Sequence, residues 1–132
     1  MKTSEAAVAI VKAHFCETEG IELIDAKRGD VGYDLKNLDE TLFVEVKGSA
    51  NEKIPFRYFT NSEYEKARVC RRNKLRYEIH IVIGIGDGTH SDHYVITADE
   101  LIREAKPEIQ WCFPVRKKRI LNNSVMKEGN NK

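Results

Sequence analysis

The sequence predicts an α/β fold, a single domain in which helices flank a mixed β-sheet. At 132 residues the chain is long enough for one hydrophobic core and short for two. Its hydrophobic fraction of 41% and charged fraction of 33% are typical of a globular protein with a solvated surface. Helical and strand patterns alternate in the order helix, strands, helix, strands, helix, which places a sheet between helices.

The chain opens with a pattern that predicts a helix from Ser4 to about Glu17. Ser4 can cap its first turn, and Gly20 just beyond its end is a typical stop. Apolar residues recur along one face at helical spacing: Ala7, Val8, Val11 and Phe15.

Three strands are expected next, over residues 21–26, 31–37 and 42–48. The second and third enclose the turn-like residues 38–41 and therefore predict an antiparallel hairpin. Another short strand is expected over residues 55–60, with proline at its start, where it removes no ladder hydrogen bond.

The second half of the chain predicts two helices around a pair of strands. Ser62 and Glu65 fit a capping box that opens a helix over about residues 63–73. Residues 77–85 and 93–97 are expected to be partner strands. The capping-box pattern recurs in the sequence TADE at residues 97–100, where a short helix should begin and end before Pro107.

The expected domain spans residues 1–121, and residues 122–132 are expected to be a flexible polar tail. We find no apolar stretch long enough to cross a bilayer and no signal-peptide pattern, so we expect a cytoplasmic protein without membrane partners. The three cysteines form no CxxC pair, and we interpret them as reduced thiols. Near His90 and His93 a metal site is conceivable, but a solvated turn is the favoured interpretation.

Two carboxylates and a lysine in the expected hairpin form the candidate site. Asp34 and Glu45 are equidistant from the centre of the turn at residues 39–40, so a tight hairpin would place them opposite each other. Opposed side chains share a face, with Cβ atoms about 4.5–5.5 Å apart. Because side chains alternate along a strand, Lys47 joins Glu45 on that face, and the flanking valines point the other way.

Two facing anions repel each other unless a cation or a proton compensates them. A divalent metal such as Mg²⁺ or Mn²⁺ would remove the conflict between Asp34 and Glu45. Mg²⁺ needs one or two carboxylates and keeps several waters, which leaves room for a phosphate oxygen and an attacking water. Lys47 could orient that water or stabilise the charge that develops on the phosphate.

The stretch GYDLKNLDETLFVEVKGS, residues 32–49, resembles the core of the PD-(D/E)xK nucleases, and the likeness covers roughly the first half of the chain. More narrowly, GYDL, VEVKGS and the following TNSEYEKA resemble the NO VEIN carboxy-terminal domain family. The last of these motifs includes Asn61 and Glu63, to which the resemblance assigns no role.

The resemblance implies a restriction-endonuclease-like fold and a metal-dependent hydrolysis of phosphodiesters. It implies that Asp34 and Glu45 bind the metal, that Lys47 assists the reaction, and that Glu5 in the first helix is an auxiliary catalytic residue. The expected function is therefore that of a Mg²⁺-dependent endonuclease whose substrate is nucleic acid, with DNA as the first expectation.

Basic residues are unevenly distributed and offer a nucleic-acid contact. Six lie within residues 66–76, a stretch that contains no acidic residue, and a second cluster covers residues 116–119. Such a run is often a solvated face, but it can also neutralise phosphates. We expect Arg68, Arg71 and Arg72 to hold the nucleic-acid backbone.

Two alternatives to an independent nuclease remain open. One is a non-catalytic nucleic-acid-binding or assembly module that keeps the nuclease fold and binds in a salt-sensitive way. The other is a component of a restriction or defence system whose cutting depends on a partner. A single site of this type cuts one strand, so cleavage of both strands would indicate a homodimer or paired action.

Overall fold

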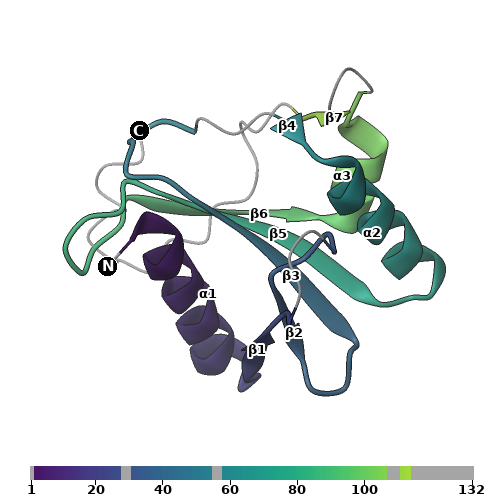
Figure 1. Cartoon of the computed structure of the whole chain (residues 1–132), viewed down its shortest axis with the longest axis horizontal. Coiled ribbons are helices and arrows are strands. Elements are labelled where there is room, and N and C mark those ends of the chain that lie inside the picture. The colour runs from purple at the N-terminus through teal and green to yellow at the C-terminus, as the bar shows by residue number, and fades with distance from the viewer. Residues whose placement is uncertain (1, 28–30, 55–57, 107–110, 114–132) are drawn as a thin grey trace.

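The protein is described by a computed structural model, which covers residues 2–27, 31–54, 58–106 and 111–113. Its helices and strands follow one another as the alternating sequence pattern predicts (Figure 1). The elements are α1 (Thr3–Glu19), β1 (Leu23–Asp25), β2 (Leu35–Asn37), β3 (Leu42–Gly48), β4 (Tyr58–Phe59), α2 (Asn61–Arg72), β5 (Arg76–Ile83), β6 (Asp92–Thr97), α3 (Ala98–Glu104) and β7 (Trp111–Cys112).

Five strands form one mixed sheet in the order β1-β2-β3-β5-β6. The pairs β1–β2, β2–β3 and β5–β6 are antiparallel, whereas β3 and β5 are parallel. The parallel pair requires a crossover connection, which α2 provides between β3 and β5. Strands β4 and β7 form a separate two-stranded sheet. The predicted α/β domain with a mixed sheet flanked by helices is confirmed.

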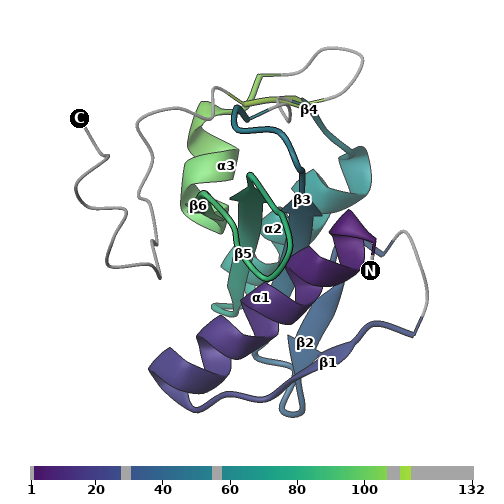
Figure 2. The same cartoon turned by 90° about the vertical axis from the view of Figure 1, so that its left-hand side faces the viewer.

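Helix α1 covers one face of the sheet, and α2 and α3 cover the other. Figure 2 shows α1 in front of the sheet with the other two helices behind it. Each face has its own apolar cluster. Under α1 the buried residues are Ala7, Val11, Phe15, Leu23, Leu35, Leu42, Val44 and Val82. Under α2 and α3 they include Phe43, Tyr64, Ala67, Cys70, Ile79, Ile81, Ile96 and Leu101.

The start of α1 differs from the prediction. The helix begins at Thr3, Lys2 occupies the cap position, and no side chain there caps the helix, so the assignment of Ser4 as the cap is wrong. At the other end, Gly20 has a φ of 68° and closes the helix, as expected of a glycine stop.

The start of α2 is also different from the predicted one. Thr60 is the cap, and it forms a reciprocal capping box with Glu63, so the proposed box of Ser62 and Glu65 is wrong by two residues. The α3 box of Thr97 and Glu100 is confirmed. Residue 55, the cluster at 116–119 and the tail at 122–132 lie outside the described residues.

The interpretation of residues 90–93 as a solvated turn is wrong for His93. Strand β6 begins at Asp92, and its pairing with β5 buries His93 completely. The Nε2 atom of His93 lies 2.7 Å from Nδ1 of His80, whose own Nε2 lies 2.8 Å from Glu78. Burial lowers the pKa of His93 to about 2, so this ring is neutral at physiological pH.

Candidate active site

The β2–β3 hairpin has the register that the sequence predicts. Leu35 pairs with Val44 and Lys36 with Phe43, which is the register expected for a turn centred between residues 39 and 40. The strand is shorter than expected, because β2 begins only at Leu35. The amide of Asp34 donates to the carbonyl of Val44, the partner of Leu35, at 2.8 Å, so the ladder is offset by one residue at Asp34. The two carboxyl groups still interact, because the charge of Asp34 helps to raise the pKa of Glu45.

Asp34 is oriented by the neighbouring strand. Its Oδ2 accepts a hydrogen bond of 2.9 Å from the backbone amide of Val46 on β3. The segment before it is held by Tyr77, whose hydroxyl donates to the Gly32 carbonyl at 2.7 Å. The carboxylate is therefore placed by β3 and β5 together.

Gly32 lets this segment approach α2 closely. Its φ is +87°, and a Cβ atom there would collide with the Ser62 carbonyl oxygen in the first turn of the helix. A side chain would therefore be strained by the backbone conformation and blocked by the helix. The close fit brings the start of α2 to the carboxylate pair.

Glu45 and Lys47 lie on the face of β3 that is turned toward α2. Side chains alternate along a strand, and Phe43 on that face belongs to the cluster under α2, whereas Val44 belongs to the cluster under α1. The Lys47 Nζ atom lies 3.8 Å from Oε2 of Glu45. The predicted juxtaposition of Asp34, Glu45 and Lys47 is thus present.

A third carboxylate, that of Glu63, joins them from α2. It is 6% exposed, and its Oε2 lies 3.2 Å from the Lys47 ammonium. The sequence held a signal for this residue, because Thr60 and Glu63 have the capping-box spacing. A capping box of Ser62 and Glu65 would start the helix two residues later, and Glu63 would then not be its capping glutamate.

The site carries more negative than positive charge. Burial, followed by the charges of Glu63 and Asp34, raises the pKa of Glu45 to about 9. Burial also raises the pKa of Asp34, although the Val46 amide and Lys47 oppose the shift. At neutral pH Glu45 therefore holds a proton, unless a cation replaces it.

Asp34 and Glu45 border two hollows in the surface. One, of about 530 Å³, extends toward α1 and includes Glu5 on its wall. The other, of about 250 Å³, lies beside α2 and includes Glu63. Glu5 is exposed in the first turn of α1, so the structure places this predicted residue across a cavity from the carboxylate pair.

The donor set fits a hard divalent cation that keeps waters. Asp34 and Glu45 offer carboxylate oxygens, and the charges of Glu63 and Asp34 add to burial in raising the pKa of Glu45. In the part of the chain that the structure describes, no group of three or more His, Cys, Asp or Glu side chains is arranged to hold a metal ion. Any metal here would therefore be held by Asp34 and Glu45 alone, and Mg²⁺ is commonly bound through one or two carboxylates.

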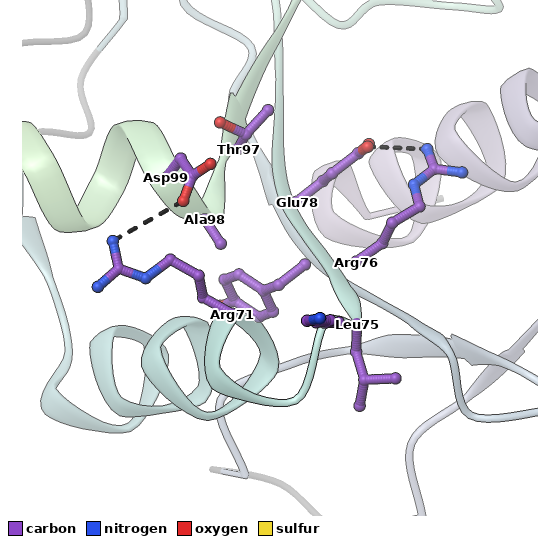
Figure 3. Close-up of a pocket in the computed structure, with 9 residues that line it drawn as sticks. Arg71, Leu75, Arg76, Glu78, Thr97, Ala98 and Asp99 are labelled. Atoms are coloured by element: carbon purple, nitrogen blue, oxygen red, sulfur yellow. Dashed lines mark hydrogen bonds and ion pairs between the residues drawn. The ribbon is translucent and has the colours of Figure 1, made fainter.

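The arginines predicted to bind nucleic acid lie away from this site. Arg68, Arg71 and Arg72 are exposed on α2. Arg71 is eight residues beyond Glu63, which corresponds to about 12 Å along the helix axis. Its guanidinium lies 3.8 Å from Asp99 at the start of α3, beside a pocket shown in Figure 3. The structure does not bring these arginines to the carboxylates.

Fold and site together define a small α/β domain with a partly buried carboxylate–lysine centre at the junction of a hairpin and a helix start. The chain belongs to the family described as Protein NO VEIN, C-terminal, whose model matches residues 4–96. That range includes all four residues of the centre, Asp34, Glu45, Lys47 and Glu63. Comparison with curated proteins and with solved structures gave no match. No helix in the described ranges has the length and apolar character needed to cross a membrane.

Proposed function

We propose that this chain is a Mg²⁺- or Mn²⁺-dependent phosphodiesterase that cleaves nucleic acid, with DNA as the substrate, in the manner of the PD-(D/E)xK nucleases. One observation carries the proposal: the partly buried Glu45 interacts with two other carboxylates, those of Glu63 and Asp34, and its pKa is raised to about 9. Strongly shifted carboxylates in a cleft are typical of functional sites. Carboxylates gathered in this way cost free energy, and a bound cation would offset that cost.

Asp34 and Glu45 are the residues that would hold the metal. The Val46 amide fixes the orientation of Asp34, and the sheet pairing fixes the position of Glu45. A bound Mg²⁺ or Mn²⁺ would polarise the phosphate and lower the pKa of a water. Glu5, across the larger cavity, is the auxiliary carboxylate in this proposal.

Lys47 acts on the reacting groups. Its ammonium is positioned beside Glu45 to orient the attacking water and to stabilise charge on the phosphoryl oxygens. The oxygen of the water bonds to phosphorus while the bond to the leaving sugar oxygen breaks. The proton released by the water passes to solvent, and the leaving oxygen receives a proton from solvent.

The nucleic acid would be held by the exposed arginines of α2, Arg68, Arg71 and Arg72. Their separation from the carboxylates favours one alternative: a non-catalytic nucleic-acid-binding or assembly module, in which these arginines bind without hydrolysis. Either form could serve a restriction or defence system. Cleavage of both strands would need two copies, as in a homodimer.

The decisive experiment is calorimetric titration of Mn²⁺, followed by incubation with plasmid and single-stranded DNA. The wild type is compared with Asp34→Ala/Glu45→Ala and with a matched control, Asp39→Ala/Glu65→Ala, which removes the same two residue types from exposed positions. We expect binding and nicking by the wild type and the control only. DNA binding by a folded wild type that neither binds Mn²⁺ nor nicks would favour the non-catalytic module.

A further inference from the structure

Glu63 divides its two carboxylate oxygens between two partners. Oε1 accepts a hydrogen bond of 3.1 Å from the backbone amide of Thr60, and Oε2 lies 3.2 Å from Nζ of Lys47. The amide of Glu63 in turn donates to the Thr60 hydroxyl at 3.1 Å. The helix start therefore fixes the carboxylate, and the carboxylate reaches the lysine.

Lys47 is a long side chain that needs such a contact to be ordered. Its ammonium is 3.8 Å from Glu45, too long for a hydrogen bond, and 3.2 Å from Glu63, within the range of a charge-assisted one. The ring of Phe59 lies under it, with 5.2 Å between Nζ and the ring centroid. The side chain of Lys47 is 14% exposed, so little water competes with these contacts.

We propose that Glu63 is the positioning residue for Lys47, holding its ammonium beside Glu45 in the orientation that the proposed hydrolysis uses. The part of this inference that concerns catalysis rests on the proposed function; the part that concerns the placement of Lys47 does not. A metal bound at Glu45 would weaken the attraction between Glu45 and Lys47. The contact with Glu63 keeps the ammonium in place when that happens.

The same chain contains the matched control. Helix α3 opens with the same capping box, in which Glu100 accepts from the amide and the hydroxyl of Thr97, at 2.9 and 3.3 Å, through Oε1 alone. A capping box therefore needs one oxygen of its glutamate. In α2 the second oxygen is directed at Lys47, which a capping role does not require.

The test removes the charge of Glu63 and keeps the cap. Glutamine also serves at this position of a capping box, so Glu63→Gln should fold, and Glu100→Gln is its control. The first readout is the ¹H–¹⁵N signal of the lysine ammonium groups in metal-free protein, with Lys47 assigned by its loss in Lys47→Gln. We expect a slowly exchanging Lys47 signal in the wild type and in Glu100→Gln, and its loss or broadening in Glu63→Gln.

The second readout is plasmid nicking with Mn²⁺. We expect Glu63→Gln to lower kcat by roughly 10- to 100-fold with little change in KM, because a misplaced Lys47 affects the reaction more than substrate binding. Glu100→Gln should keep the wild-type kcat. Because both glutamates cap helices, a loss that is equal in the two variants would overturn the proposal.

The two readouts separate this inference from the proposed function. A Lys47 signal that is unchanged in Glu63→Gln overturns the positioning role even if the wild type nicks DNA. A signal that depends on Glu63 in a protein that never nicks DNA supports the positioning role and overturns the nuclease. If Glu63→Gln does not fold, Glu63→Asp keeps the charge but withdraws it by one methylene. The same loss of the Lys47 signal is then expected.

Discussion

Glu45 and Glu78 lie on the adjacent central strands β3 and β5, and the side chain of each is 13% exposed. Their acidities are nevertheless opposite. The pKa of Glu78 is lowered to about 2, although burial alone would raise it, because His80 and Arg76 each contact it at 2.8 Å (Figure 3 shows the Arg76 contact). The pKa of Glu45 is raised to about 9, because burial is reinforced by Glu63 and Asp34.

Burial by itself therefore does not decide what a glutamate does in this sheet; its partners do. Glu78 is compensated by its own neighbours and continues through Arg76 to Glu19, which the guanidinium contacts at 2.8 Å. That network joins β5 to α1 and is complete without a ligand. Glu45 has the opposite charge balance. The carboxylates of Asp34 and Glu63 outnumber the ammonium of Lys47, and a bound cation would compensate the excess negative charge. The difference separates a structural acid from a candidate metal ligand.

The largest expected effect is the destabilisation caused by Glu78→Gln. This change leaves Arg76 and His80 without their carboxylate and should lower the free energy of unfolding at pH 7 by about 2–3 kcal/mol, below the full value for a buried pair because Arg76 is partly exposed. Urea denaturation measures it, with the exposed Glu22→Gln as control. A loss equal to that of the control would mean that the two glutamates do not differ as described.

The next effect is stabilisation by metal. Mn²⁺ at 100 times its dissociation constant should raise the free energy of unfolding of the wild type by about 2.7 kcal/mol. The increase should persist in Glu78→Gln and disappear in Glu45→Gln, because the second change removes a proposed ligand. Denaturation with and without Mn²⁺ measures it. Equal increases in both variants would place the metal elsewhere.

Without metal, Glu45→Gln should stabilise the protein. The amide replaces a carboxyl group that its neighbours disfavour in the charged form, and at pH 8 we expect a gain of about 1–2 kcal/mol in the free energy of unfolding. The same substitution therefore has opposite signs at positions 45 and 78. A loss of stability in metal-free Glu45→Gln would contradict the charge imbalance at the site.

The smallest expected effects are the slopes of stability with pH. Glu45 has a pKa raised from 4.5 to about 9, so its contribution to stability is full below pH 4.5 and is lost as the pH rises through 9. Glu78 has a pKa lowered from 4.5 to about 2, so its contribution is present above pH 4.5 and is lost as the pH falls toward 2. Each slope is at most about 1.4 kcal/mol per pH unit.

Denaturation from pH 3 to pH 9 separates these two contributions. The gain in Glu45→Gln should grow from pH 5 to pH 9, and the loss in Glu78→Gln should shrink below pH 4.5. Parallel profiles for the wild type and both variants would show that neither group titrates as described.

Much of the site follows from local rules. The register of the hairpin, with Leu35 opposite Val44, could be predicted because the turn at residues 38–41 is short, and a short turn permits few pairings. Its geometry includes the Asn37 side chain, which accepts from the amides of Thr41 and Leu42. The position of Lys47 followed from the alternation of side chains along β3.

Other features of the fold cannot be predicted from the sequence, because several residues satisfy the same local pattern. Thr60 and Ser62 are both followed three residues later by a glutamate, and the sequence does not say which pair caps α2. The packing of α2 against the sheet decides it, because it buries Glu63 and leaves Glu65 exposed. His93 is a similar case, since its burial depends on the pairing of β6 with β5.

The sequence by itself determined the alternation of helices and strands, the hairpin, and the shared face of Asp34, Glu45 and Lys47, because these depend on spacing within one short segment. Only the tertiary structure decided that Glu63 reaches Lys47, that Glu5 borders the carboxylate cavity while Arg71 does not, and that the pKa of Glu45 is raised to about 9. Each of these depends on groups brought together from segments far apart in the chain, whereas the partners that lower the pKa of Glu78 lie two residues away on its own strand. Electrostatic interactions act through distance in space, which the packing of α1 and α2 on the sheet sets.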